Sequence, residues 1–143
     1  MNKTRAIADS SELGMIRYHL YKHLIGHYLA AMEQGYYLEA ITLMESLITD
    51  RLESALIYNE IIPADKAFLT LGSALNRIKS TGILSQDLYS KIDAWRISRN
   101  AALHEIAKIE EGSAPVFNER YIQQASVAKD GYQLFKDIKQ ELK

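Results

Sequence analysis

The sequence predicts an all-α protein, an up-and-down bundle of about five helices that forms one domain across residues 1–143. Apolar residues recur at intervals of three and four along most of the chain, which is the spacing of a buried helical face. The two prolines, Pro63 and Pro115, both lie between such stretches. The intervening connections are short, as they are in helical bundles.

The composition narrows the class of protein. The chain has 48% hydrophobic and 24% charged residues, and its formal net charge of −1 gives none of the global basic field that many duplex-DNA binders use. The absence of cysteine excludes disulfides and thiolate metal sites and fits a reducing compartment. Residues 1–12 lack the apolar core of a secretory signal, and no apolar run approaches the roughly 20 residues of a membrane span. We therefore expect a cytoplasmic protein without membrane contact.

The first two helices are predicted over residues 9–34 and 36–58. Asp9 and Glu12 have the spacing of a capping box at the start of the first helix, and Gly35 suits its C-terminal stop. The second helix carries a continuous apolar stripe at helical spacing. The residues of that stripe are Leu38, Ile41, Ile48, Leu52 and Leu56.

The third helix is predicted over residues 64–81, with Gly82 closing it. The fourth is predicted over residues 86–111, with Ser85 as its N-cap and Gly112 after its end. The third helix is expected to bury Phe68, Leu71, Leu75 and Ile78.

The last helix is predicted to begin at an Asn118 N-cap and to run to about Leu142. Five helices of this length, joined by short loops, are what a bundle requires. The residues expected to be buried along this last helix are Tyr121, Ala125, Ala128, Tyr132, Phe135 and Ile138.

Three histidines, His19, His23 and His27, stand one turn apart on the first predicted helix. Neutral imidazoles at this spacing are able to share a metal ion. No carboxylate or cysteine completes a recognisable ligand set, and the row drifts by about 40° per step. Ordinary packing and surface histidines are therefore favoured over a metal site, and no metal or cofactor is expected.

The fourth predicted helix carries a charge inside its apolar face. Arg99 belongs to the same three-and-four series as the apolar residues Leu88, Ile92, Trp95, Ala102, Ile106 and Ile109. Burying an unpaired guanidinium is costly, so such a residue marks a paired or a functional site. Asn100 and His104 form a second row, one turn apart, roughly 100–160° round the helix from Arg99. The plainer interpretation, an ion-paired Arg, a tolerated Asn and a surface His, stays open beside the functional one.

Glu45 interrupts the stripe of the second helix in the same way and with the opposite sign. A buried charge is tolerated mainly when it is paired, so we predict an ion pair between Glu45 and Arg99. The alternative is that Glu45 faces a partner subunit or reaches solvent past small neighbours.

The pattern Arg99-Asn100-x3-His104 resembles the signature of the HEPN superfamily. That signature is an Arg, usually followed by a polar residue, with a His four to six residues beyond. HEPN domains are four- to five-helix bundles that carry this motif on a late, long helix followed by one more. The predicted order of helices is similar, so the resemblance covers most of the chain in architecture and about six residues in motif.

The resemblance implies a metal-independent endoribonuclease, because many HEPN proteins have this activity and many act in toxin–antitoxin or phage-defence systems. They typically form homodimers in which two motif helices share a cleft. Arg99, Asn100 and His104 would then be the catalytic residues, the substrate would be single-stranded or loop RNA, and a cognate antitoxin or regulatory protein would be a partner. One toxin branch has a Tyr two residues after the His, where this chain has Ile106, so that branch is not expected.

The residue chemistry agrees with such a reaction. Metal-free RNA cleavage by transesterification, which leaves a 2′,3′-cyclic phosphate, needs a base, an acid and a cation for the charge on phosphate. His104 suits proton transfer, Arg99 suits phosphate, Asn100 is an orienting hydrogen-bond partner, and Glu45 would hold Arg99 in place. Two alternatives remain: a non-catalytic HEPN-like module that docks a partner protein on the same helix face, and a ligand-binding regulator that uses the same cationic cleft.

Overall fold

The computed structural model describes residues 12–66, 68–104 and 117–142, and within them every regular element is helical. The elements are α1 (Glu12–Gln34), α2 (Tyr37–Tyr58), the 3-10 helix η1 (Ala64–Lys66), α3 (Leu71–Ile78), α4 (Gln86–His104) and α5 (Phe117–Glu141). The predicted all-α class is confirmed. None of the described helices is both long and apolar enough to cross a membrane.

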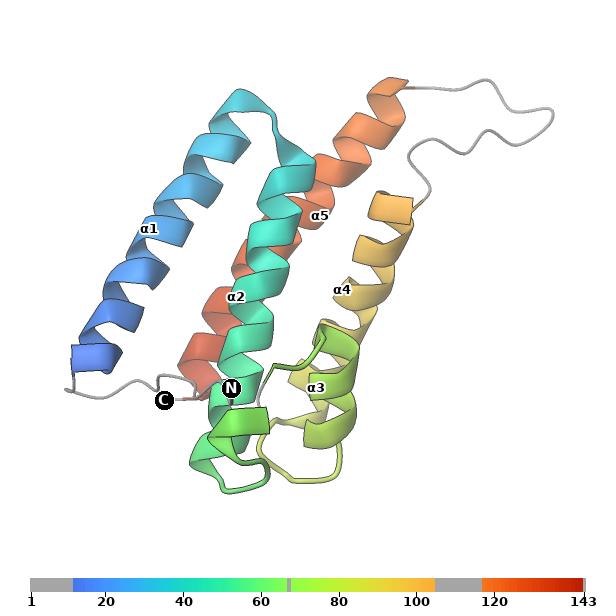
Figure 1. Ribbon diagram of the computed structural model, residues 1–143. Coiled ribbons are helices and arrows are strands. Elements are labelled where there is room, and N and C mark those ends of the chain that lie inside the picture. Colours follow the sequence, from blue (N-terminus) through green and yellow to red (C-terminus); the bar gives the residue numbers. More distant parts are fainter. Residues whose placement is uncertain (1–11, 67, 105–116, 143) are drawn as a thin grey trace.

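The four long helices alternate in direction along the chain, as the up-and-down prediction requires (Figure 1). In that view α2 lies in front of α5, and α1 and α4 flank this pair on opposite sides. The short α3 lies at one end of the bundle and packs on α2 and α4. The hydrophobic core lies where these helices meet. Its fully buried large side chains are Ile41, Met44, Leu47, Ile48, Leu52, Leu56, Leu71, Leu75, Ile78, Ile92, Phe135 and Ile138.

Two buried aromatic side chains tie the flanking helices to α5. The hydroxyl of Tyr28 in α1 donates to the backbone carbonyl of Ala128 at 2.9 Å, and the indole Nε1 of Trp95 in α4 donates to that of Val127 at 2.9 Å. Consecutive carbonyls of α5 therefore accept hydrogen bonds from opposite sides. A Cβ atom on Gly131 would lie 2.8 Å from the Trp95 ring, so only glycine leaves room for this contact.

The prediction for the third helix is wrong in its extent. Instead of one helix over residues 64–81, the chain forms η1 and then the two-turn α3. Thr70 is the N-cap of α3, since its Oγ1 accepts from the Ser73 amide at 3.2 Å, and Glu53 Oε1 accepts from the Leu69 amide at 2.9 Å. These side-chain bonds satisfy backbone donors that a continuous helix would have used. Phe68, predicted to be buried, is 61% exposed.

The fifth helix also differs in detail from the prediction. It begins at Phe117, so Asn118 lies inside the helix and is not its N-cap. Tyr121 is 47% exposed instead of buried, because its hydroxyl reaches across to donate to the Gly35 carbonyl at 2.9 Å. Tyr132 is half-buried, as is Ala125.

Several predicted helix ends are confirmed. Ser85 Oγ accepts from the Leu88 amide at 3.2 Å, as an N-cap does. Gly35 directly follows α1 and has a φ of +77°, the left-handed conformation that commonly follows a helix. The predicted stop at Gly82 is wrong, because α3 ends at Ile78 with Lys79 as its C-cap, and Gly82, with a φ of +75°, lies in the connection beyond. The predicted Asp9 cap, the stretch 105–111 and the Gly112 stop lie outside the described residues.

Candidate functional site

Arg99 and Glu45 form an ion pair between α4 and α2. The guanidinium Nη2 lies 2.6 Å from Glu45 Oε1, and the two side chains are 14% and 26% exposed. The predicted pairing is therefore confirmed. Arg99 Nε is buried and has no hydrogen-bond partner among the described residues.

The position of Arg99 follows from the register of α4. Leu88, Ile92, Trp95 and Ala102 are buried on the same face, and the helical repeat brings residue 99 onto that face between them. Its long side chain reaches the edge of the interface, where Glu45 comes from the neighbouring helix. An arginine therefore replaces a core residue at the place where α2 and α4 face each other.

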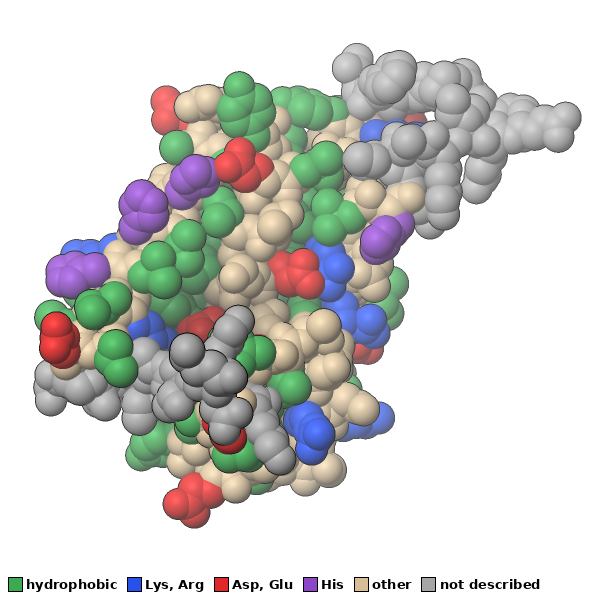
Figure 2. Space-filling model, viewed as in Figure 1, with side chains coloured by type: hydrophobic (Ala, Val, Ile, Leu, Met, Phe, Trp, Pro, Cys, Tyr) green, Lys and Arg blue, Asp and Glu red, His purple; other side chains and the backbone are tan. Residues whose placement is uncertain are grey.

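Asn100 and His104 do not join this pair. A helix advances by about 100° per residue, so His104 lies about 140° round α4 from Arg99 and Asn100 about 100°. Asn100 is half-buried, and His104, the last residue of α4, is exposed. The arc between Arg99 and His104 also carries Arg96, whose Nη2 lies 2.9 Å from Asp93 Oδ1. Figure 2 shows basic side chains gathered over α3 and α4, beside a carboxylate near the middle of this face.

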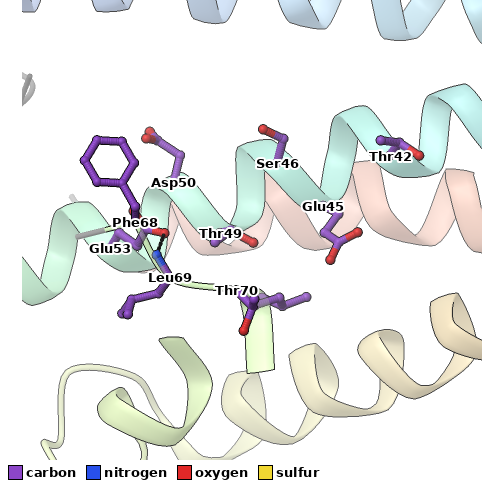
Figure 3. A pocket seen from close by; sticks show the side chains of 10 residues that line it. Thr42, Glu45, Ser46, Thr49, Asp50, Glu53, Phe68, Leu69 and Thr70 are labelled. Carbon is purple, nitrogen blue, oxygen red and sulfur yellow. Dashed lines mark hydrogen bonds between the residues drawn. The ribbon is translucent and has the colours of Figure 1, made fainter. Parts of the chain in front are cut away.

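A groove of about 480 Å³ runs along α2 next to the Arg99–Glu45 pair. Glu45 lines it, so the carboxylate belongs to both the ion pair and the groove, whereas Arg99, Asn100 and His104 are not among the lining residues. In Figure 3, Glu45 and Thr42 lie toward one end, and Phe68 and Glu53 lie at the other. Seven of the ten residues that line the groove carry a hydroxyl or a carboxylate. The full lining is Thr42, Glu45, Ser46, Thr49, Asp50, Glu53, Phe68, Leu69, Thr70 and Leu71.

A second arginine–carboxylate pair lies on the other side of this groove. Arg17 of α1 binds Asp50 of α2, and its Nη2 also donates to Ser54 Oγ at 2.8 Å. The Tyr21 hydroxyl donates to the same Asp50 oxygen, and the guanidinium lies 4.6 Å from the centre of the Tyr21 ring. Burial lowers the pKa of Arg17 from its ordinary value.

This second pair was missed by the sequence reasoning. The signal was present, because Arg17 falls in the three-and-four series of Tyr21, Leu24, Tyr28 and Ala31, just as Arg99 interrupts the series of α4. The result is an arrangement in which two of the carboxylates that α2 presents to the groove, Glu45 and Asp50, are paired with arginines. Each is held by an arginine from the helix on that side.

The histidine row of α1 is not organised around a metal ion in the part of the chain that the structure describes, where no group of three or more potential ligands occurs. His27 Nε2 lies 2.6 Å from Glu39 Oε1, and the rings of His23 and His27 are 6.5 Å apart. His27 and Glu39 are both exposed. The geometry favours the interpretation as surface histidines, one of which pairs with a carboxylate of α2.

Comparisons with protein-family models, with curated proteins and with solved structures find no match for this chain. The HEPN resemblance of Arg99 to His104 therefore stays a prediction. What the site offers chemically is a fixed cation at a helix interface, a second arginine and an amide on the adjoining arc, and an exposed imidazole at its far edge.

Proposed function

We propose that this protein is a metal-independent endoribonuclease that cleaves single-stranded or loop RNA as a homodimer. The observation that carries the proposal is Arg99, a cation held by Glu45 between α4 and α2, with the half-buried Asn100 and the exposed His104 about 100° and 140° round the same helix. Arginine binds phosphate oxygens through a planar fork, and histidine is the side chain best suited to proton transfer near neutral pH.

A second copy completes the site. One chain offers a single motif histidine, whereas cleavage uses both a base and an acid. A two-fold interface places the same patch of both subunits together, so a dimer across the arc of α4 between Arg99 and His104 supplies two imidazoles and two guanidiniums. The arc carries the half-buried Arg96 and Asn100, together with Asp93, which pairs with Arg96.

These groups account for each proton transfer in the reaction, and no other reactant is needed. The ribose 2′-oxygen attacks phosphorus and loses its proton to one His104. The bond from phosphorus to the 5′-oxygen breaks, and the His104 of the other copy protonates the leaving oxygen. Arg99 stabilises the charge on the phosphate oxygens, and Asn100 orients the phosphate. The products are a 2′,3′-cyclic phosphate and a 5′-hydroxyl.

Incubation of the purified protein with total RNA tests the proposal. His104→Ala is expected to lower the cleavage rate by about 10²–10⁴-fold and to leave RNA affinity nearly unchanged, because Arg99 and Asn100 supply the phosphate contacts. Arg99→Lys keeps the charge but loses the fork, so both affinity and rate should fall. Cleavage should persist in excess chelator, and the plot of cleavage rate against pH should be bell-shaped. Cleavage that survives in His104→Ala would contradict the assignment of this residue.

The second candidate is a non-catalytic module that docks a partner protein on the same face of α4. The Arg99–Glu45 ion pair favours it, because Arg99 already has a carboxylate and needs no ligand to be tolerated in the interface. A wild-type protein that cleaves no RNA, but whose Arg96→Ala variant loses a bound protein, would support this function over the nuclease.

A further inference from the structure

The exposed side of α1 carries a continuous stripe at helical spacing, made of Tyr18, Lys22, Gly26, Leu29 and Glu33. The steps of four, four, three and four keep these residues on one face. All five are exposed, Tyr18 at 53% and Leu29 at 50%. A Cβ atom at Gly26 would meet nothing within 4 Å. The stripe therefore combines two large side chains with apolar surface, a glycine with open space above it and one charge of each sign.

We propose that this stripe binds the same stripe of a second copy, with the two α1 helices antiparallel. If the two-fold axis passes between residues 27 and 28, residue 22 faces residue 33 of the other copy, and residue 26 faces residue 29. Lys22 then pairs with Glu33 of the partner subunit, twice by symmetry. Leu29 packs on the partner subunit's Gly26, where the lack of a side chain allows close approach, also twice.

The charges on the stripe favour a second copy of α1 as the partner, and they favour an antiparallel orientation. Lys22 and Glu33 are three turns apart on one helix, so they complement a second α1 only when it runs the opposite way. A parallel copy would set Lys22 against Lys22 and Glu33 against Glu33, which is unfavourable. The self-complementary pattern is what an isologous interface requires. It also gives each exposed Leu29 an apolar contact in place of water.

The stripe is separate from the face used in the proposed function. Figure 1 shows α1 and α4 on opposite sides of the α2–α5 pair, so a contact through α1 leaves Arg99 and His104 uncovered. A protein that forms both the α1 contact and the proposed dimer across α4 would assemble beyond the dimer. A single pair of helices buries an area at the small end of specific interfaces, so association through α1 is expected at micromolar protein concentrations.

Charge exchange tests the pairing directly by sedimentation velocity at tens of micromolar. The Lys22→Glu chain and the Glu33→Lys chain each carry like charges along the stripe, so each alone should self-associate at least tenfold more weakly than wild type. Mixed in equal amounts, the two variants should associate again, because one stripe is then acidic and the other basic. The double variant should also recover association. Lys79→Glu, an exposed charge reversal at the end of α3, is the control and should match wild type.

The proposal would be overturned if the single variants self-associate as strongly as wild type. It would also be overturned if the mixed variants do not associate although circular dichroism shows that both chains are folded. RNA cleavage is measured in the same samples. Neither Lys22 nor Glu33 belongs to the proposed nuclease site, so loss of association with cleavage retained separates the two proposals. Recovery of association in a protein that never cleaves RNA would support the α1 contact and reject the nuclease.

Discussion

Two arginines of this protein are largely withdrawn from solvent, and each depends on one carboxylate of α2. Arg17 binds Asp50, and Arg99 binds Glu45, with side-chain exposures of 10% and 14% for the two arginines. Both have a buried Nε without a hydrogen-bond partner in the described part of the chain. Such cations cost little while the carboxylate is present and cost much more when it is removed.

Glu45→Ala should therefore destabilise the protein clearly more than removal of a surface carboxylate. The change leaves Arg99 without its carboxylate in a position that is 14% exposed, and we expect a loss of about 1–3 kcal/mol in the free energy of unfolding. Glu119→Ala, at an exposed position of α5, should stay within about 0.5 kcal/mol. Urea unfolding of the two variants gives the comparison, and equal losses would reject a stabilising role for the pair.

The pairing of Arg99 with Glu45 was predictable because each charge interrupts an otherwise apolar stripe. The Arg17–Asp50 pair was not predicted, although Arg17 interrupts a stripe too, because Asp50 lies off the apolar face of α2 and gave no matching signal. Sequence periodicity reveals a charge that has to be neutralised. It does not reveal which of several nearby carboxylates will do so, since that depends on which helices become neighbours.

The Trp95 ring restricts position 131 to glycine. In Gly131→Ala the new Cβ would lie 2.8 Å from the Trp95 ring, and overpacking of this kind costs about 1–3 kcal/mol, more than the gain in helix propensity of about 0.5–1 kcal/mol. Gly72→Ala is the matched control, because its Cβ would lie 4.0 Å from Arg96 Cδ, an ordinary contact. We expect a lower melting temperature for the first variant and an unchanged or slightly higher one for the second. A Gly131→Ala protein as stable as wild type would show that the ring moves freely.

Among the elements, α3 shows where periodicity misleads. The apolar series from Phe68 to Ile78 has helical spacing throughout, but the helix begins only at Leu71. Thr70 and Glu53 decide the start, because their side chains bind the amides of Ser73 and Leu69. Threonine is a common N-cap residue, but at position 70 it lies inside the helix that periodicity predicted. The hydrogen bond from the Leu69 amide to Glu53 joins two parts of the chain that are distant in sequence, so no local sequence pattern predicts it.

The contact between α1 and α5 should be sensitive to alkaline pH. Burial, together with the neighbouring Tyr132, raises the pKa of Tyr28 to about 12, against about 10 in the unfolded chain. Folding thus favours the neutral phenol, so its contribution to stability is complete below about pH 10 and is lost as pH rises from there through about 12. Tyr28→Phe should flatten the decline in stability over this window.

Tyr58→Phe is the matched control for that titration, because Tyr58 is 85% exposed. Urea unfolding of wild type and both variants at several pH values between 9 and about 12 would show the difference. If all three proteins lose stability with the same slope, Tyr28 does not carry the pH dependence.

At the scale of the whole molecule, the all-α class and the approximate positions of five helices were predictable, because they rest on local periodicity and on glycine and serine at helix ends. The placement of α1 and α4 on opposite sides of the α2–α5 pair (Figure 1) was not. It is decided by which apolar faces fit together. The one inter-helix contact that the sequence did predict is the turn of Arg99 toward Glu45 of α2, because both charges interrupt apolar stripes.

A shared cleft predicts how wild type and His104→Ala behave when mixed. If each cleft needs a histidine from both copies, a mixed dimer is inactive, and an equal mixture that has exchanged subunits should keep about a quarter of the wild-type rate, the share of dimers with two intact copies. If each copy works alone, about half should remain. Cleavage rates measured across mixing ratios would separate a squared dependence on the wild-type fraction from a linear one.

The hydrogen bond from the Trp95 indole to Val127 gives this protein a built-in optical reporter. The chain has one tryptophan, and its ring is 5% exposed where α4 meets α5. Its fluorescence emission therefore arises from a single place, and a red shift marks the entry of water between these two helices. The Tyr28 hydroxyl of α1 donates to the next carbonyl of α5, that of Ala128. Emission that shifts before the helical circular dichroism is lost would mean that α4, with its Arg99 and His104, separates from α5 while the helices themselves are still formed.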